Sequence, residues 1–402
     1  MSRKQLIEMT RRHIAHAKAG TQDQAPSIFS VPALNYYDPN RWQLEMERIF
    51  KRLPLTLGIS SELREPGAYQ ALEVAGVPVL LTRGSDGEMR AFVNTCSHRG
   101  AIIVPDGVGR ARRFVCPYHG WSYDQKGALV GIRDNTDFGD LDKSCHGLVP
   151  LPVAERAGLI FVVLRPEATD RQAVDIDTFL QGYDKLLEQL GLDECFVVGR
   201  QSVEGPNWKI AYDGYLDFYH LPILHKDSFG SKIPNKAVYD AWGPHQRVGM
   251  PIPGMEALEA MPEEDWPLEG MTAGVWTIFP HVSVASFDAG GKLYMLSQLF
   301  PGDTPDVSVT NQIFLSPVEP DAEHQAKIDE QMTFLKDVVR DEDYYTGKRI
   351  QRSIKTGAKK DVLFGRNEGG GQRFHSWVEA IIHTEDANLA TVLGSKLGPE
   401  VK

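Results

Sequence analysis

The chain has 402 residues, and at about 150 residues per domain it has room for two or three domains. Apolar residues make up 42% of the sequence and charged residues 24%, which are ordinary values for a globular protein with a hydrophobic core. The formal net charge of −11 argues against nucleic acid or an anionic membrane as a partner of the whole chain. The longest apolar runs, such as residues 157–164, are too short to cross a bilayer, so no membrane span is expected.

Cysteine is scarce, and the whole chain has four: Cys96, Cys116, Cys145 and Cys195. So few cysteines do not make a disulfide scaffold and are typical of a reducing compartment, where thiols stay free or bind metal. Cys145 and Cys195 are predicted to be small hydrophobic side chains without a metal. The basic N-terminal segment lacks the apolar stretch of a secretory signal and is predicted to be a surface helix. The expected location is the cytoplasm.

In chain order, the first well-signalled helix begins at Asp38, an N-cap residue that is followed by Pro39 at the first helical position. One buried stripe at helical spacing follows: Trp42, Met46, Ile49 and Phe50. Between residues 67 and 165, short β-rich runs alternate with glycine-containing turns, which predicts a small all-β domain. The runs are residues 68–74, 77–82, 89–94, 112–116, 148–153 and 159–164.

Residues 166–171 are predicted to be a linker, and a helical stripe over residues 176–190 then ends at Gly191. A helical pattern near the end of the chain covers about residues 322–354. Between the two helices lie strand-like runs at residues 196–203, 275–287, 292–300 and 307–315. Several antiparallel strands and a long late helix predict an α+β domain, with a sheet wrapped on a helix.

Two short segments of the predicted β domain, Cys-x-His and Cys-x2-His, contain four possible metal ligands: Cys96, His98, Cys116 and His119. Each segment supplies one thiolate and one imidazole, so two facing loops would enclose one metal site. A structural zinc site usually groups its cysteines before its histidines. The alternating order is typical of a Rieske [2Fe–2S] cluster, with two cysteines on one iron and two histidines on the other. Zinc is the alternative.

A second group of ligand types lies in residues 207–227, NWKIAYDGYLDFYHLPILHKD. Asp213, Asp217 and His220 are spaced i, i+4 and i+7, so a helix would place them on one face. A proline two residues after His220 predicts that this helix ends or bends there, which would bring His225 to the same point. Two histidines and one carboxylate are the ligands of non-haem Fe(II) in O2-activating enzymes. Spacing alone does not show which acid would supply the carboxylate: Asp213, Asp217 or a distant residue.

Together the two groups resemble the α subunits of Rieske non-haem iron oxygenases, the aromatic-ring-hydroxylating family. The resemblance extends over nearly the whole chain and includes CPYHGW and NWK followed by D-x3-D-x2-H-x4-H. It implies that a [2Fe–2S] cluster is bound by Cys96, His98, Cys116 and His119, and a mononuclear Fe(II) by His220, His225 and Asp343. It also implies that Asp217 links the cluster of one subunit to the iron of the next. Where this chain has Gly214, the family often has an asparagine that supports the iron site.

The implied organisation is an N-terminal helical segment (residues 1–50), a Rieske β domain (residues 51–165) and a helix-grip catalytic domain (residues 166–402) on which the N-terminal segment packs. The implied activity is that of a terminal oxygenase. O2 and electrons from NAD(P)H would serve to mono- or dioxygenate, or oxidatively demethylate, a hydrophobic aromatic or alicyclic compound. A separate ferredoxin or reductase would relay the electrons, because no dinucleotide fingerprint follows a predicted strand. Family members form homotrimers, some with a β subunit.

Four arginines flank the cluster segments and are candidates for docking an acidic ferredoxin: Arg99, Arg110, Arg112 and Arg113. Five apolar residues lie on predicted strands, and two interpretations of them stay open: they line a substrate pocket, or they only pack in the core. They are Trp276, Phe279, Phe287, Met295 and Phe300. Two other functions stay open on the residues alone. One is an electron carrier without oxygenase activity, which leaves residues 207–227 without a role, and the other is a zinc-stabilised binding module.

Overall fold

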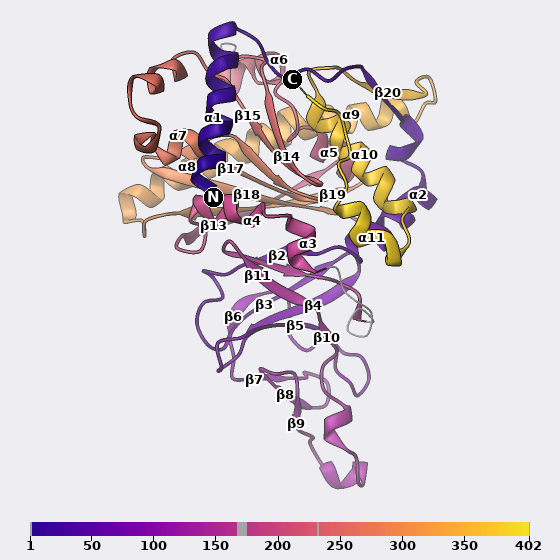
Figure 1. Ribbon diagram of the computed structural model, residues 1–402. Coiled ribbons are helices and arrows are strands. Elements are labelled where there is room, and N and C mark those ends of the chain that lie inside the picture. Colours follow the sequence, from indigo (N-terminus) through magenta and orange to yellow (C-terminus); the bar gives the residue numbers. More distant parts are fainter. Residues whose placement is uncertain (1, 167–174, 231–232, 402) are drawn as a thin grey trace. The chain divides into compact units, whose positions relative to one another are not determined.

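The computed structural model describes residues 2–166, 175–230 and 233–401 (Figure 1). The chain divides into two compact units. The first, here called the sheet–helix unit, consists of Met1–Ile49, Asp177–Gly191 and Cys195–Lys402. The second, the β unit, consists of Phe50–Ile176 and Leu192–Glu194. Apart from Pro166, the predicted linker lies outside the described residues.

Short antiparallel strands form the β unit, in three sheets with the orders β10-β5-β4-β3-β6, β11-β12-β2 and β7-β8-β9. The strands are β2 (Leu55–Ile59), β3 (Ala68–Val74), β4 (Val77–Arg83), β5 (Met89–Val93), β6 (Gly107–Arg110), β7 (Arg113–Val115), β8 (Ser122–Asp124), β9 (Leu129–Gly131), β10 (Pro150–Leu151), β11 (Val153–Arg156) and β12 (Leu159–Val162). Two 3-10 turns, Asn135–Phe138 and Lys143–Cys145, lie between β9 and β10. The predicted strand at residues 148–153 is two strands, because Pro152 has no N–H group to donate to a ladder.

One hydrophobic cluster of the β unit packs side chains of β3–β5 against side chains of β7–β9. Phe92, Phe114 and Tyr123 are among its buried members. Cys96 and Cys116 belong to the same cluster, at 2% and 3% exposure. The first residue of each predicted ligand segment is therefore packed in the hydrophobic core of the β unit.

A seven-stranded antiparallel sheet, in the order β13-β19-β18-β17-β16-β15-β14, forms the core of the sheet–helix unit. Its strands are β13 (Phe196–Gly205), β14 (Val238–Trp242), β15 (His245–Gly249), β16 (Val275–Ile278), β17 (Val282–Asp288), β18 (Lys292–Pro301) and β19 (Ser308–Ser316). The predicted run at residues 275–287 is two strands with a turn at Pro280. The sequence analysis does not predict β14 and β15, because both bury polar side chains such as Asp240, His245 and Arg247.

The predicted late helix is a helical stretch with a π turn in its middle: α8 (Ala322–Val338), η10 (Val339–Tyr344) and α9 (Tyr345–Ile354). Ile328 and Leu335 of α8 pack against Met295 and Phe314 of the sheet. Two helices after β20 (Asp361–Phe364) are not predicted from the sequence, α10 (Gly369–His383) and α11 (Asp386–Leu393). The predicted α+β fold class, with an antiparallel sheet and a long late helix, is confirmed.

The predicted helix over residues 176–190 is wrong as a single element. It consists of α3 (Ile176–Leu180), α4 (Asp184–Leu187) and a 3-10 turn, Glu188–Leu190. Gln181 and Gly182 separate the pieces with φ values of 51° and 81°, which lie outside the helical region. Further short segments complete the unit: α5 (Trp208–Asp213), α6 (Leu221–Leu224), η7 (Lys226–Gly230), two 3-10 turns (Met255–Ala260 and Glu263–Asp265) and α7 (Leu268–Thr272).

Residues before the β unit form α1 (Ser2–Ala19), β1 (Phe29–Pro32), a 3-10 turn (Ala33–Tyr36), α2 (Pro39–Glu45) and a π turn (Met46–Phe50). As predicted, Asp38 caps α2, and its Oδ1 accepts a hydrogen bond from Asn40 N at 2.7 Å. Glu45, at the end of α2, is fully buried and lies 2.5 Å from Lys209 Nζ. Trp208 Nε1 donates to the same carboxylate at 2.8 Å. The NWK motif therefore attaches the N-terminal segment to the sheet–helix unit.

In the part of the chain that the structure describes, no helix combines the length and the apolar character needed to cross a membrane.

Candidate metal sites

The Cys-x-His and Cys-x2-His segments form two loops with the same hydrogen-bond pattern. Gly100 N donates to Cys96 O at 2.9 Å, and Gly120 N donates to Cys116 O at 3.0 Å. Both glycines have positive φ values, 76° and 72°, which glycine adopts without steric cost. Each loop thus turns back four residues after its cysteine, and both cysteines are free thiols.

The two histidines of these loops face each other, with ring centroids 4.6 Å apart. Nδ1 of His98 and Nδ1 of His119 are buried, and neither has a hydrogen-bond partner among the described residues. Burial lowers the pKa of His119, helped by His98 and Arg99, so its imidazole stays neutral. Buried, unpaired nitrogen atoms are rare in proteins, and a metal bound at each Nδ1 would satisfy them.

Donor spacing separates a cluster from a single zinc ion. The ligand atoms of a tetrahedral zinc site lie about 3.3–3.8 Å apart, given bonds of about 2.0–2.3 Å. Within the described residues, no three of these four donors lie within 4.8 Å of one another. The two loops fit a two-iron cluster better than one zinc ion.

Aromatic side chains surround the two loops. Trp121 stacks on the His98 ring at 4.9 Å, and the Tyr118 ring lies 3.7 Å from that of His119. Tyr123, which the sequence analysis does not single out, has its hydroxyl 3.3 Å from Cys96 Sγ. The same hydroxyl accepts a hydrogen bond from Ser97 N at 3.0 Å, so its proton is free to point at the sulfur. Burial and the Cys96 contact raise the pKa of Tyr123 to about 12, which keeps that proton in place.

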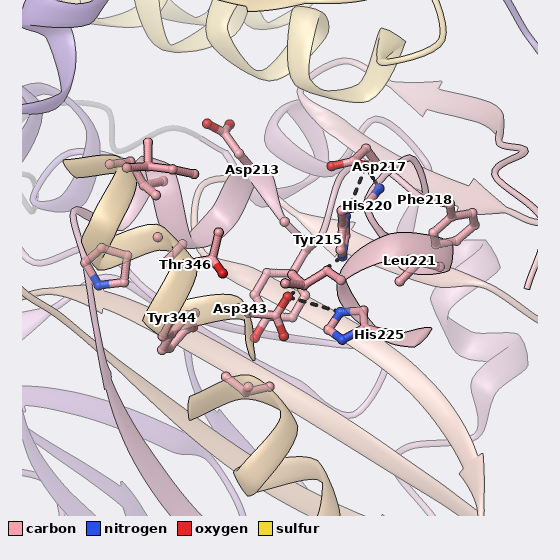
Figure 2. A pocket seen from close by; sticks show the side chains of 18 of the residues that line it. Asp213, Tyr215, Asp217, Phe218, His220, Leu221, His225, Asp343, Tyr344 and Thr346 are labelled. Atoms are coloured by element: carbon pink, nitrogen blue, oxygen red, sulfur yellow. Dashed lines mark hydrogen bonds and ion pairs between the residues drawn. The ribbon is translucent and has the colours of Figure 1, made fainter. Parts of the chain in front are cut away.

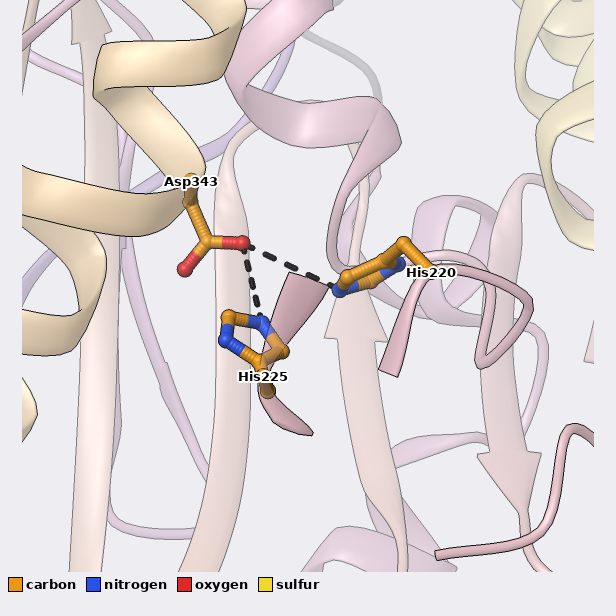
Figure 3. A group of neighbouring side chains, drawn as sticks. All are labelled: His220, His225 and Asp343. Atoms are coloured by element: carbon orange, nitrogen blue, oxygen red, sulfur yellow. Dashed lines mark ion pairs between the residues drawn. The ribbon is translucent and has the colours of Figure 1, made fainter. Parts of the chain in front are cut away.

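A second group of donors lies in the sheet–helix unit, where His220, His225 and Asp343 converge (Figure 3). Asp343 Oδ1 lies 3.8 Å from His220 Nε2 and 3.2 Å from His225 Nε2. The two imidazole centroids are 5.2 Å apart. Among the described residues, this is the only set of three such side chains whose ligand atoms all lie within 4.8 Å of one another.

The local structure that brings the histidines together differs from the predicted one. A single helix through His220 is wrong, because α5 (Trp208–Asp213) ends at Asp213. Asp217 and His220 lie in the turn that follows, and α6 (Leu221–Leu224) begins directly after His220. Pro222 lies in the first turn of α6, where its missing N–H is tolerated, so it starts a helix instead of ending one.

Asp217 and Asp343 lie beside the imidazoles, whereas Asp213 lies apart from them (Figure 2). Asp217 Oδ1 lies 3.0 Å from His220 Nδ1 and also accepts hydrogen bonds from two backbone N–H groups, those of Tyr219 and His220. Asp213 is directed elsewhere: it accepts a hydrogen bond from Tyr36 OH at 3.0 Å and lies 2.9 Å from His375 Nε2. Of the acids that spacing left open, Asp343 is the one between both imidazoles.

A further carboxylate was missed from the sequence: Glu342 Oε2 lies 2.5 Å from His225 Nδ1. Its only sequence signal is that it precedes Asp343. Although burial favours the neutral imidazole, the neighbouring carboxylates outweigh it and raise the pKa of His220 and of His225 above the usual value. For His220 the carboxylates are Asp217 and Asp343, and for His225 they are Asp343 and Glu342. The site therefore attracts positive charge, either protons or a cation.

These donors open on a cavity of about 370 Å³. Phe287 and Met295 line it, as the sequence analysis allowed, whereas the other three candidates pack in the core: Trp276, Phe279 and Phe300. Gly214 also lines the cavity, and a Cβ there would have only Ala211 O, at 3.7 Å, as a neighbour. This part of the wall has room that a side chain would fill.

Two surface predictions have different outcomes. Cys145 is exposed and donates a hydrogen bond to Asp142, so it does not behave as the small hydrophobic side chain that was predicted, whereas Cys195 is buried. All four arginines near the cluster loops are exposed: Arg99, Arg110, Arg112 and Arg113. The Arg99 guanidinium lies 5.4 Å from the Tyr118 ring centroid.

Two protein-family descriptions match the chain. "Rieske [2Fe-2S] domain" matches residues 54–144, and "Ring hydroxylating alpha subunit (catalytic domain)" matches residues 192–384. The chain belongs to the family of Rieske oxygenase α subunits. The cofactors of this family are a Rieske [2Fe–2S] cluster and a mononuclear iron, and the two donor sets fit them.

Similar curated proteins include the glycine betaine monooxygenase oxygenase subunit of Chromohalobacter salexigens, 32% identical over 55% of this chain and 49% of that protein. The chlorobenzene dioxygenase subunit alpha of Cupriavidus sp. is 35% identical over 46% of this chain and 42% of its own length. The chain thus spans about half the length of the curated relatives that it matches. Among solved structures, naphthalene 1,2-dioxygenase from Rhodococcus sp. has a TM-score of 0.73, with 22% identity, 96% of this chain and 100% of that chain covered. At this identity the likeness shows the fold alone.

Proposed function

We propose that the chain is the terminal oxygenase component of a multicomponent enzyme. It would use O2 and electrons that originate from NAD(P)H to mono- or dioxygenate, or oxidatively demethylate, a hydrophobic aromatic or alicyclic compound. The observation that carries the proposal is the His220, His225 and Asp343 group at the wall of an apolar cavity. An electron carrier needs the donors of the β unit alone.

The two donor sets have different roles in this proposal. The [2Fe–2S] cluster would be held by Cys96, His98, Cys116 and His119, and the mononuclear iron by His220, His225 and Asp343. When bound, the cluster supplies electrons singly and the iron supplies the O2 chemistry. The chain's own contribution at the second site is to hold two imidazoles in one tautomer, with each Nδ1 on a carboxylate and each Nε2 toward Asp343.

Asp217 would connect neighbouring copies of the chain. Its three hydrogen bonds to described residues all use Oδ1, so within that part of the chain Oδ2 remains for a donor from outside. In the β unit, the orphaned Nδ1 atoms of His98 and His119 would face the cluster, which leaves Nε2 of each ring to donate. A hydrogen bond from either histidine to Asp217 of a second copy would connect the copies in the homotrimer that we propose. A β subunit, where the complex has one, would co-purify with it.

The electron-transfer partners would be a separate ferredoxin, a reductase or both. The exposed arginines beside the cluster loops suit an acidic carrier. The cytoplasm is the proposed location, because the four cysteines are free thiols. Breakdown of aromatic hydrocarbons is the kind of metabolism in which such a system would act.

The lining of the cavity favours an uncharged substrate. Its described side chains are mostly apolar and aromatic, and they include no lysine or arginine. Those with a formal charge are four acids: Asp213, Asp217, Asp343 and Glu368. A substrate carboxylate, such as that of glycine betaine, would lose its hydration without gaining a lysine or arginine partner, which is costly. A neutral ring loses little on entering such a cavity.

Substrate-dependent O2 consumption tests the proposal, with reduced ferredoxin and a library of aromatic, steroidal and methoxylated compounds beside glycine betaine and carnitine. We expect turnover with a neutral compound and three iron atoms per chain. Two iron atoms and no turnover would indicate an electron carrier, and a colourless zinc protein would indicate a binding module. Turnover with a betaine alone would keep the oxygenase and reject the neutral substrate.

A further inference from the structure

Glu342 contacts the second site from the same π turn as Asp343. Its Oε2 lies 2.5 Å from Nδ1 of His225, while Asp343 Oδ1 lies 3.2 Å from Nε2 of the same ring. Ser228 Oγ donates a second hydrogen bond to Glu342 Oε2 at 2.9 Å. One carboxylate oxygen thus joins two side chains of a segment that is more than a hundred residues away in sequence.

The local backbone explains how neighbouring residues both reach His225. Glu342 and Asp343 lie in η10, the π turn between α8 and α9, and His225 directly precedes the π turn η7. A π turn inserted in a helix is uncommon and is found mostly at functional sites. Here two such turns are connected by the hydrogen bonds that His225 and Ser228 make to Glu342.

Asp341, one residue earlier, shows what an ordinary surface acid does in this turn. Its side chain is 58% exposed and pairs with the adjacent Arg340. The Glu342 side chain is 25% exposed and is held by two partners across the site. A solvated acid has no reason to order two distant side chains, since surface pairs contribute little.

We infer that Glu342 is a positioning residue for the metal held by His225. By accepting a hydrogen bond from the Nδ1–H group, Glu342 keeps Nε2 of His225 as the unprotonated ligand atom. The same bond fixes the plane of the ring and increases the basicity of Nε2. Asp217 holds the same position behind His220, so each imidazole has a carboxylate of its own. The inference rests on the proposed function, because it needs a metal at this site.

Cobalt(II) titration of the full chain, with its cluster intact and its mononuclear iron removed by a chelator, tests the inference. Cobalt(II) bands in the visible spectrum report the ligand geometry. We expect Glu342→Gln, which keeps an oxygen acceptor but loses the charge, to bind cobalt(II) about 10–100-fold more weakly with shifted bands. Glu342→Ala should bind cobalt(II) more weakly still, and Ser228→Ala should lose less affinity. The matched control Asp341→Asn should behave like the wild type.

The outcomes separate this inference from the proposed function. His220→Ala lacks one of the proposed ligands. If the wild type binds cobalt(II) no better than this variant, the proposed metal site itself is wrong. If the wild type binds and Glu342→Gln matches it in affinity and bands, the role of Glu342 is overturned. An equal loss in Asp341→Asn would also overturn it, because removal of any nearby charge would then suffice. An unchanged far-UV circular dichroism spectrum and an unchanged urea midpoint in every variant show that the sheet–helix unit is intact.

Discussion

The donors of the β unit and those of the sheet–helix unit are assembled in different ways. The first set lies within 24 residues of sequence, on two loops whose glycines and backbone hydrogen bonds fix the positions of the ligands. The second set joins His220 and His225 to Asp343, more than a hundred residues later, and carboxylates orient its imidazoles. A site built on tight loops depends on its own segment. A site built across a sheet and two π turns depends on the packing of the whole unit.

The strongest way to break this comparison is to remove one set and ask whether the other survives. We expect Cys116→Ser to lose the [2Fe–2S] visible absorbance completely, because the proposed ligand is the Cys116 thiolate and a serine hydroxyl would be a poor replacement. The mononuclear site should still bind one iron per chain, since its donors belong to the other unit. Iron analysis and cobalt(II) titration measure this. Loss of both metals would show that the two sites are not independent.

Asp217→Asn tests the one side chain that would link the two kinds of site. The variant keeps an oxygen acceptor for His220 Nδ1 but loses its charge, so it should bind the mononuclear iron more weakly and is loaded with excess Fe(II) before the assay. Its cluster and the proposed trimer should be retained. Product formation should fall about 100-fold or more, because the charged acceptor for the histidine of the neighbouring copy is gone. Asp227→Asn, an exposed acid in η7, is the matched control. Normal turnover of a fully loaded Asp217→Asn trimer would reject the route through Asp217.

The contrast between donors close in sequence and donors far apart in sequence also explains which features could be predicted from the sequence. The β strands and the cluster segments are local patterns, so spacing and turn residues predict them. Asp343 came only from the family resemblance, because its spacing from the histidines says nothing about distance in space. The end of α5 at Asp213 and the π turn at Val339–Tyr344 are set by tertiary packing, which helical periodicity does not report. Glu342 was missed for that reason.

Glu45→Gln should weaken the sheet–helix unit and leave the loops of the β unit intact. Lys209 is 1% exposed, and its ammonium would lose its carboxylate partner. Breaking one partner of a buried ion pair costs about 3–5 kcal/mol. We expect about 3 kcal/mol, because burial already lowers the pKa of Lys209 and lets it shed its proton. Urea unfolding followed by far-UV circular dichroism should show the loss, while the cluster absorbance in buffer should not change.

Tyr123→Phe sharpens the other side of the comparison, because it alters one hydrogen bond in the loops. The Tyr123 hydroxyl lies 3.3 Å from Cys96 Sγ, and with a cluster bound at the thiolate it would donate to the sulfur and stabilise the reduced, more negative cluster. One such bond contributes about 1 kcal/mol, which corresponds to about 40 mV for a one-electron couple. We expect the reduction potential to fall by about that amount, as measured by spectroelectrochemistry. The mononuclear site should keep its metal affinity, and an unchanged potential would mean that the hydroxyl does not donate to the sulfur.

The expected effect that depends most on salt concentration concerns the surface of the β unit. Changing Arg110, Arg112 and Arg113 to glutamate should slow reduction of the cluster by an acidic ferredoxin about tenfold at low salt, because charge steering raises association rates by about 10–10³. The difference should shrink at high salt, since the screening length falls from about 10 Å at 0.1 M to about 3 Å at 1 M. The control carries the same change of charge on exposed residues of the sheet–helix unit: Arg352, Lys359 and Lys360. Stopped-flow absorbance of the cluster measures both variants. If the control slows reduction equally, the net charge of the chain steers the carrier and the arginines do not form a docking site.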